Sequence, residues 1–94
     1  MPLFLISYDV NYKHKDEYQS LWDHLAKIGA VKILFSEWLI VGEYNGAEQI
    51  FNGIMPHLKM PDRLLVQEVN ANAWWDKLLI PDDDFRAILR EARG

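Results

Sequence analysis

One carboxylate in this chain stands at a position where chemistry commonly occurs. Asp9 directly follows the strand-like run of residues 3–8, so it lies where the chain leaves the sheet. Mg²⁺ prefers oxygen donors but needs more than one anionic contact. A two-fold axis close to Asp9 would supply the second carboxylate from another copy of the chain, and the ion would activate water and neutralise phosphate charge. The alternative is that Asp9 caps a turn with Asn11 and has no catalytic role.

Basic and hydroxyl side chains near this aspartate are candidates for phosphate binding. Lys13 and Lys15 follow in the loop after the first strand, and Ser36 lies at a predicted hairpin near the strand ends. Because phosphate affinity is mostly electrostatic, the lysines would hold a phosphate beside the metal. In the alternative, the loop is solvated and the two acidic residues that follow cancel the lysine charges. For Ser36 the alternative is a hydrogen bond within the turn.

The tryptophan pair Trp74-Trp75 is predicted to form part of a dimer interface. Tryptophan can stack on nucleic acid bases, but burial or a protein interface is its commoner role. The histidines have no partner at i, i+4, so no zinc-binding helix motif is present. His24 and His57 are predicted to be structural or surface residues.

Composition excludes several classes of protein. The 94 residues contain no cysteine, which removes disulfides, thiol nucleophiles and cysteine-based zinc sites and suits a reducing compartment. A formal net charge of −4 argues against a general nucleic-acid coat protein. No signal sequence or membrane-spanning run is evident, and no Gly-rich nucleotide-binding motif occurs. We therefore expect a soluble cytoplasmic protein without a membrane partner.

The hydrophobic periodicity predicts two helices and four strands in residues 1–69. The expected elements are a strand over 3–9, a helix over 16–28, strands over 31–36 and 38–42, a second helix up to about 58, and a strand over 64–69. Gly29 is expected to stop the first helix in a left-handed conformation. Asn45 is expected to cap the second helix, with Glu48 completing a variant capping box. Pro56 should end or kink that helix.

The order β-α-β-β-α-β predicts an α+β fold of the ferredoxin-like type, with an antiparallel sheet that has both helices on one face. The first and third strands should be central. The other face is expected to be covered by a second copy of the chain. Residues 1–69 form the predicted domain, and residues 70–94 form an extension that is expected to pack on the dimer partner. Its last helix should begin at the acidic run 82–84, which suits the positive end of the helix dipole.

Three segments resemble a known family. The strand end Ile6-Ser7-Tyr8-Asp9, the helix stop at Gly29 and the hairpin Ser36-Glu37-Trp38-Leu39-Ile40-Val41 are similar to the CRISPR-associated protein two superfamily. The similarity is strongest to its small stand-alone SinR-like relatives and more distant to virulence-associated protein D. It covers residues 3 to about 69.

The resemblance implies a ferredoxin-like homodimer in which Asp9 of each copy binds one Mg²⁺ for cleavage of RNA or DNA. Other members of the family are structural parts of a DNA-integration complex and do not need nuclease activity. The sequence therefore supports two main hypotheses: a Mg²⁺-dependent endonuclease, or a non-catalytic dimeric interaction module of the toxin–antitoxin type. A small-ligand-binding domain is a third hypothesis, with no motif behind it.

Overall fold

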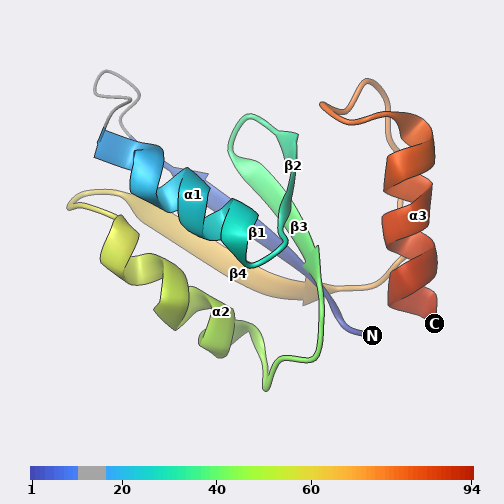
Figure 1. The fold of residues 1–94 in the computed structure, drawn as a ribbon, viewed down its shortest axis with the longest axis horizontal. Coiled ribbons are helices and arrows are strands. Elements are labelled where there is room, and N and C mark those ends of the chain that lie inside the picture. Colours follow the sequence, from blue (N-terminus) through green and yellow to red (C-terminus); the bar gives the residue numbers. More distant parts are fainter. Residues whose placement is uncertain (11–16) are drawn as a thin grey trace.

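A computed structural model describes residues 1–10 and 17–94 (Figure 1). The elements are β1 (Leu3–Asp9), α1 (Gln19–Lys27), β2 (Val31–Leu34), β3 (Glu37–Val41), α2 (Ala47–Ile54), the 3₁₀ helix η2 (Met55–His57), β4 (Arg63–Val69) and α3 (Asp82–Arg93). The predicted order of helices and strands is confirmed. The candidate phosphate ligands Lys13 and Lys15 lie outside the described residues.

The four strands form one antiparallel sheet in the order β2-β3-β1-β4. The predicted central positions of the first and third strands are therefore confirmed. β1 pairs along its full length with β4, from Leu3 opposite Val69 to Asp9 opposite Arg63. Its other neighbour is β3, which it pairs from Leu3 opposite Val41 to Ser7 opposite Glu37. The chemistry at the end of β1 thus has a strand on each side.

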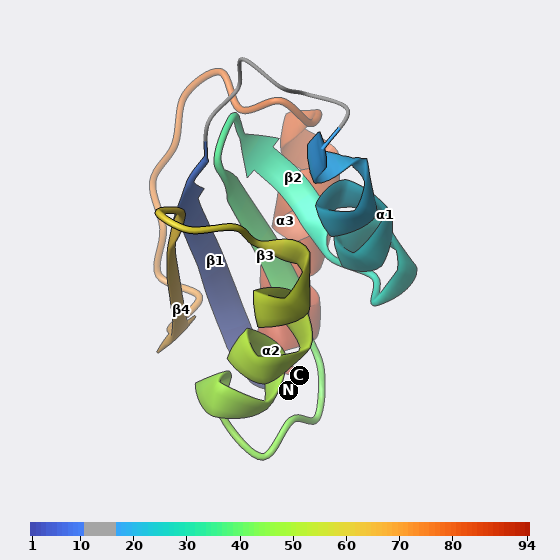
Figure 2. The ribbon, with the colours of Figure 1, turned by 90° about the vertical axis from the view of Figure 1, so that its left-hand side faces the viewer.

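One face of the sheet is covered by α1 and α2, as predicted (Figure 2). Because strand side chains alternate, Phe4, Ile6 and Tyr8 of β1 point to this face and are buried. The helices bring the hydrophobic stripe that their period predicts: Leu21 and Leu25 from α1, Ile50 and Ile54 from α2. These side chains make the larger of two hydrophobic cores.

The opposite face of the sheet is covered by the chain's own extension. Leu3, Ile33 and Leu39 on this face pack with Phe85 and Leu89 of α3, all at most 8% exposed. Further apolar side chains between β4 and α3 join them: Ala71, Ala73, Trp75, Leu78 and Ile80. The expectation that a second copy covers this face is wrong for the part under α3, and the extension lies on its own sheet where a partner was expected. The predicted helix face that includes Phe85 and Leu89 is confirmed.

Local signals at the ends of the helices were partly correct. Gly29 has φ +89°, so the predicted left-handed stop of α1 is confirmed. α2 ends at Ile54, just before the 3₁₀ turn that contains Pro56. The predicted Asn45 cap is wrong: the N-cap is Gly46, with φ 147°. The backbone N–H of Asn45 instead donates to the side-chain oxygen of Gln49 at 2.8 Å, one position beyond the expected Glu48.

The β2–β3 connection is a hairpin whose turn is Phe35-Ser36. Glu37, which the sequence suggested as the link, is the first residue of β3 and pairs with Ser7. The register of the hairpin shifts between Lys32 and Leu34. This bulge moves the turn two residues earlier than a simple strand pattern predicts.

Candidate functional site

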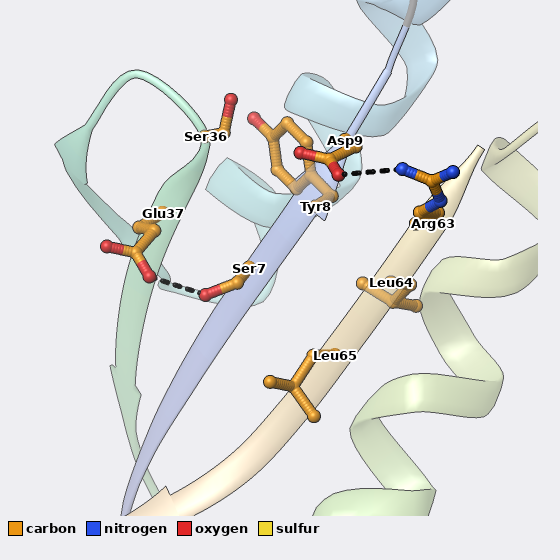
Figure 3. A pocket seen from close by; sticks show the side chains of 8 residues that line it. All are labelled: Ser7, Tyr8, Asp9, Ser36, Glu37, Arg63, Leu64 and Leu65. Carbon is orange, nitrogen blue, oxygen red and sulfur yellow. Dashed lines mark hydrogen bonds and ion pairs between the residues drawn. The ribbon is translucent and has the colours of Figure 1, made fainter.

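The largest depression described on the surface lies at the end of β1 that carries Asp9 (Figure 3). Its volume is about 380 Å³. Its lining comes from β1, β3, β4 and the hairpin turn: Ser7, Tyr8, Asp9, Ser36, Glu37, Arg63, Leu64 and Leu65. Two of the sequence-predicted site residues, Asp9 and Ser36, are therefore brought together.

Strand alternation and register explain why these polar side chains gather. Ser7 and Asp9 share the face of β1 that carries Leu3, but they lie beyond the core under α3. Ser7 is opposite Glu37 on β3 and opposite Leu65 on β4, and Asp9 is opposite Arg63. Paired residues in an antiparallel sheet point to the same face. The part of this face outside the core therefore carries two carboxylates, a hydroxyl and a guanidinium.

Asp9 is exposed and lies beside a cation. Its carboxylate is 3.6 Å from a guanidinium nitrogen of Arg63, and the two side chains are 75% and 83% exposed. An ion pair this open to solvent contributes at most about 0.5 kcal/mol. Either group can therefore turn to another ligand at low cost.

Glu37 supplies a second carboxylate to the same depression. Its Oε2 accepts a hydrogen bond from the Ser7 hydroxyl at 2.6 Å (Figure 3). A hydrogen bond to an ionised acceptor is short and strong, so Ser7 orients this carboxylate. The sequence analysis expected a second carboxylate only from a partner copy and did not identify Glu37, Ser7 or Arg63. The strand register is the signal that locates them, and the register depends on where the hairpin turns.

Tyr8 anchors the strand end from the opposite face. It is 4% exposed, and its hydroxyl accepts hydrogen bonds from the indole N–H groups of Trp38 at 2.9 Å and Trp22 at 3.2 Å. Its backbone N–H donates to the carbonyl of Ser36 at 3.1 Å. The prediction that Tyr8 packs away from Asp9 is confirmed. These bonds hold the hairpin turn and the end of β1 together, which positions Ser36 beside Asp9.

The two predicted interface tryptophans have different surroundings. The ring of Trp75 packs edge-on against Phe85 with centroids 4.5 Å apart, and its N–H donates to Asp82 at 3.1 Å. The guanidinium of Arg86 lies over its ring at 5.6 Å. Trp75 is thus engaged within its own chain. Trp74 is 99% exposed and is the one of the pair that remains open to a partner.

The donor set suits a mostly hydrated Mg²⁺ and little else. Among the described residues, no group of three or more metal-binding side chains gathers. Asp9 and Glu37 offer oxygen donors in one open depression, and Mg²⁺ commonly keeps several waters while binding one or two carboxylates. The residues present fit such an ion.

The described histidines lie away from the depression. The rings of His24 and His57 stack with centroids 4.7 Å apart, and His57 Nδ1 is 3.2 Å from the Ser20 hydroxyl. Burial lowers the pKa of His24, with further lowering from His57 and Lys27. Neither ring lines the depression, in agreement with their predicted structural role.

No protein-family model matches this chain, and no solved structure matches it. No helix in the described part of the chain has the length and apolar character that crossing a membrane requires. The functional argument therefore rests on the residues of the depression.

Proposed function

We propose that the chain is a cytoplasmic, homodimeric, Mg²⁺-dependent phosphodiesterase of the CRISPR-associated protein two superfamily, SinR-like branch, that cleaves RNA or DNA. The central positions of β1 and β3 and the two helices on one face support a ferredoxin-like fold. Asp9 at the end of β1 stands where the resemblance implies a metal ligand. The absence of cysteine is compatible with a reducing compartment.

The observation that carries the proposal is the meeting of Asp9, Glu37 and Arg63 in one open depression. Carboxylates from two neighbouring strands are the kind of ligands that a hydrated Mg²⁺ accepts. When bound, Mg²⁺ neutralises phosphate charge and makes a bound water more acidic. Asp9 and Glu37 would hold the ion, and Ser7 would keep Glu37 in place through the 2.6 Å hydrogen bond.

Arg63 would bind the substrate phosphate. A guanidinium can donate two parallel hydrogen bonds to phosphate oxygens. Its contact with Asp9 is long, at 3.6 Å, and both partners are exposed. Breaking this pair costs little, so Arg63 can exchange the carboxylate for a phosphate once Asp9 holds a cation.

A second candidate is a non-catalytic interaction module of the toxin–antitoxin type. The same ion pair favours it, because a cross-strand Asp9–Arg63 contact gives Asp9 a structural role without any metal. The exposed Trp74 is the observation that supports a protein partner in this case.

Cleavage of labelled single-stranded RNA and DNA, with Mg²⁺ and with EDTA, separates the two candidates. We expect Mg²⁺-dependent cleavage by the wild type and at least about a hundredfold loss in Asp9→Asn. Glu37→Gln and Arg63→Gln should each lower the rate by about tenfold or more. Asp84→Asn, an exposed carboxylate on α3, is the matched control and should cleave like the wild type. Absence of cleavage by the wild type, or equal cleavage by Asp9→Asn, would refute the catalytic proposal.

A further inference from the structure

The two edges of the sheet are very different. β2 forms one edge; it has only four residues, and its register is broken between Lys32 and Leu34. The extension also reaches this edge, where the N–H of Leu79 donates to the carbonyl of Ile33 at 2.9 Å. Short length, a bulge and cover by another segment are the usual ways in which proteins block an edge strand.

β4 forms the other edge and has none of these protections. It has seven residues, without proline, and pairs with β1 in an unbroken register. Among the described residues, no backbone hydrogen bond outside the sheet reaches β4. Figure 2 shows β4 at the margin of the sheet. Leu65, in the middle of the strand, is 54% exposed. A long, regular, apolar edge is a template for another strand.

We propose that β4 pairs antiparallel with β4 of a second copy, about a two-fold axis that passes through Leu65. Antiparallel pairing of identical strands requires an axis perpendicular to the sheet, and directly opposed residues then point to the same face. With the axis at Leu65, Leu65 faces the partner's Leu65 and Leu64 faces the partner's Val66. Arg63 faces the partner's Gln67. Apolar side chains meet apolar ones, and no like charges are opposed within the strand.

The neighbouring registers are less favourable. Moving the axis to Val66 would place Leu64 against the partner's Glu68, which leaves a carboxylate opposite an apolar side chain. At the end of the strand, Asp62 is already held within its own chain: its carboxylate accepts from the Tyr18 hydroxyl and from the Lys59 N–H, both at 2.9 Å. It therefore adds no repulsion to the pairing about Leu65. Sequence self-complementarity thus selects a second copy, and this register, as the occupant of the edge.

This pairing also joins the two depressions. Glu37, Ser7 and Leu65 lie in one row across β3, β1 and β4, and the axis at Leu65 continues the row into the partner on the same face. The two β1 strands would be three strand spacings apart, about 14 Å. The Asp9 side chains, two residues beyond the axis in opposite directions, are therefore too distant to share one ion. Each copy would hold its own cation with Asp9 and Glu37.

The inference rests on the homodimer in the proposed function but not on phosphodiesterase activity. Analytical ultracentrifugation of the full chain measures it directly. We expect a dimer at micromolar concentration, and Leu65→Lys should raise the dimer dissociation constant by at least about tenfold, because it opposes two ammonium groups at the axis. Leu79→Lys is the matched control, since Leu79 is a 55% exposed leucine outside β4, and it should dimerise like the wild type.

Single cysteines test the register, because the chain contains none. Directly opposed residues of antiparallel strands have Cα atoms about 4.5–5.5 Å apart, within the range that a disulfide spans. Mild oxidation should therefore cross-link Leu65→Cys into a covalent dimer. Gln67→Cys should not cross-link, since its two copies would be displaced by four residues along the strands. A monomeric wild type, a dimer that is insensitive to Leu65→Lys, or cross-linking of Gln67→Cys in preference to Leu65→Cys would each overturn the inference. Nuclease activity of a monomer would overturn the interface while leaving the catalytic proposal standing.

Discussion

The hydroxyl of Tyr8 gives the sharpest test of how the site is built. It accepts hydrogen bonds from two indole N–H groups, those of Trp38 at 2.9 Å and Trp22 at 3.2 Å. Tyr8→Phe keeps the ring in the core but removes the acceptor. Trp38 is 7% exposed, so its N–H has little access to water in the variant.

The expected cost follows from the desolvation of these donors. A buried donor left without a partner costs about 1–3 kcal/mol. Taking about 2 for the buried Trp38 and about 1 for the half-buried Trp22, Tyr8→Phe should lower the free energy of unfolding by about 3 kcal/mol. A chain of 94 residues has a total stability of about 5–14 kcal/mol. The substitution should therefore weaken the fold strongly without abolishing it.

Urea unfolding followed by far-UV circular dichroism measures this effect without depending on tryptophan fluorescence. With a slope of about 1.5 kcal/mol per M, the midpoint should fall by about 2 M at unchanged slope. Tyr44→Phe is the control: the Tyr44 ring packs edge-on against Phe4, with centroids 5.9 Å apart, and its midpoint should move by less than about 0.3 M. Equal midpoints for the two variants would refute the assignment of Tyr8 as the acceptor that anchors the strand end.

Three further outcomes are expected. Because the folded protein lowers the pKa of His24 below its ordinary value of 6.5, the unfolded chain binds this proton more readily; thermal stability should be constant above about pH 6.5 and fall as the pH drops below it, and His24→Gln should flatten this slope in melting curves. Phe85→Ala should cost about 3–4 kcal/mol in urea unfolding, because Phe85 is 4% exposed beneath α3, whereas Phe35→Ala, at a 78% exposed position, should stay within about 0.5 kcal/mol. Trp75→Ala should lower the melting temperature by several degrees or more and Trp74→Ala should leave it unchanged, since only Trp75 packs on Phe85; equal shifts would contradict the packing described.

Local sequence signals predicted the elements well where one interaction dominates. The stripe that includes Leu21 and Leu25 identified α1, and a left-handed glycine at position 29 marked its end. The second helix start was displaced by one residue, because Gly46 can adopt φ 147° and Gln49, rather than Glu48, reaches back to the backbone. Caps depend on side-chain geometry within a few ångströms, which composition alone does not specify.

The sequence by itself determined the order of the elements, the apolar faces of the helices and the place of Asp9 at the end of a central strand, because periodicity and turn residues act over a few neighbouring positions. Only the tertiary structure decided what surrounds Asp9. Glu37 and Arg63 reach it through strand pairing across 28 and 54 positions of the chain, roughly, and such long-range register depends on where each turn falls. The cover of the second face was also a tertiary choice: α3 and the segment before it are amphipathic in sequence, and only their packing shows that they cover this chain's own sheet. The same packing leaves the Asp9 end of that face, and the edge of β4, open.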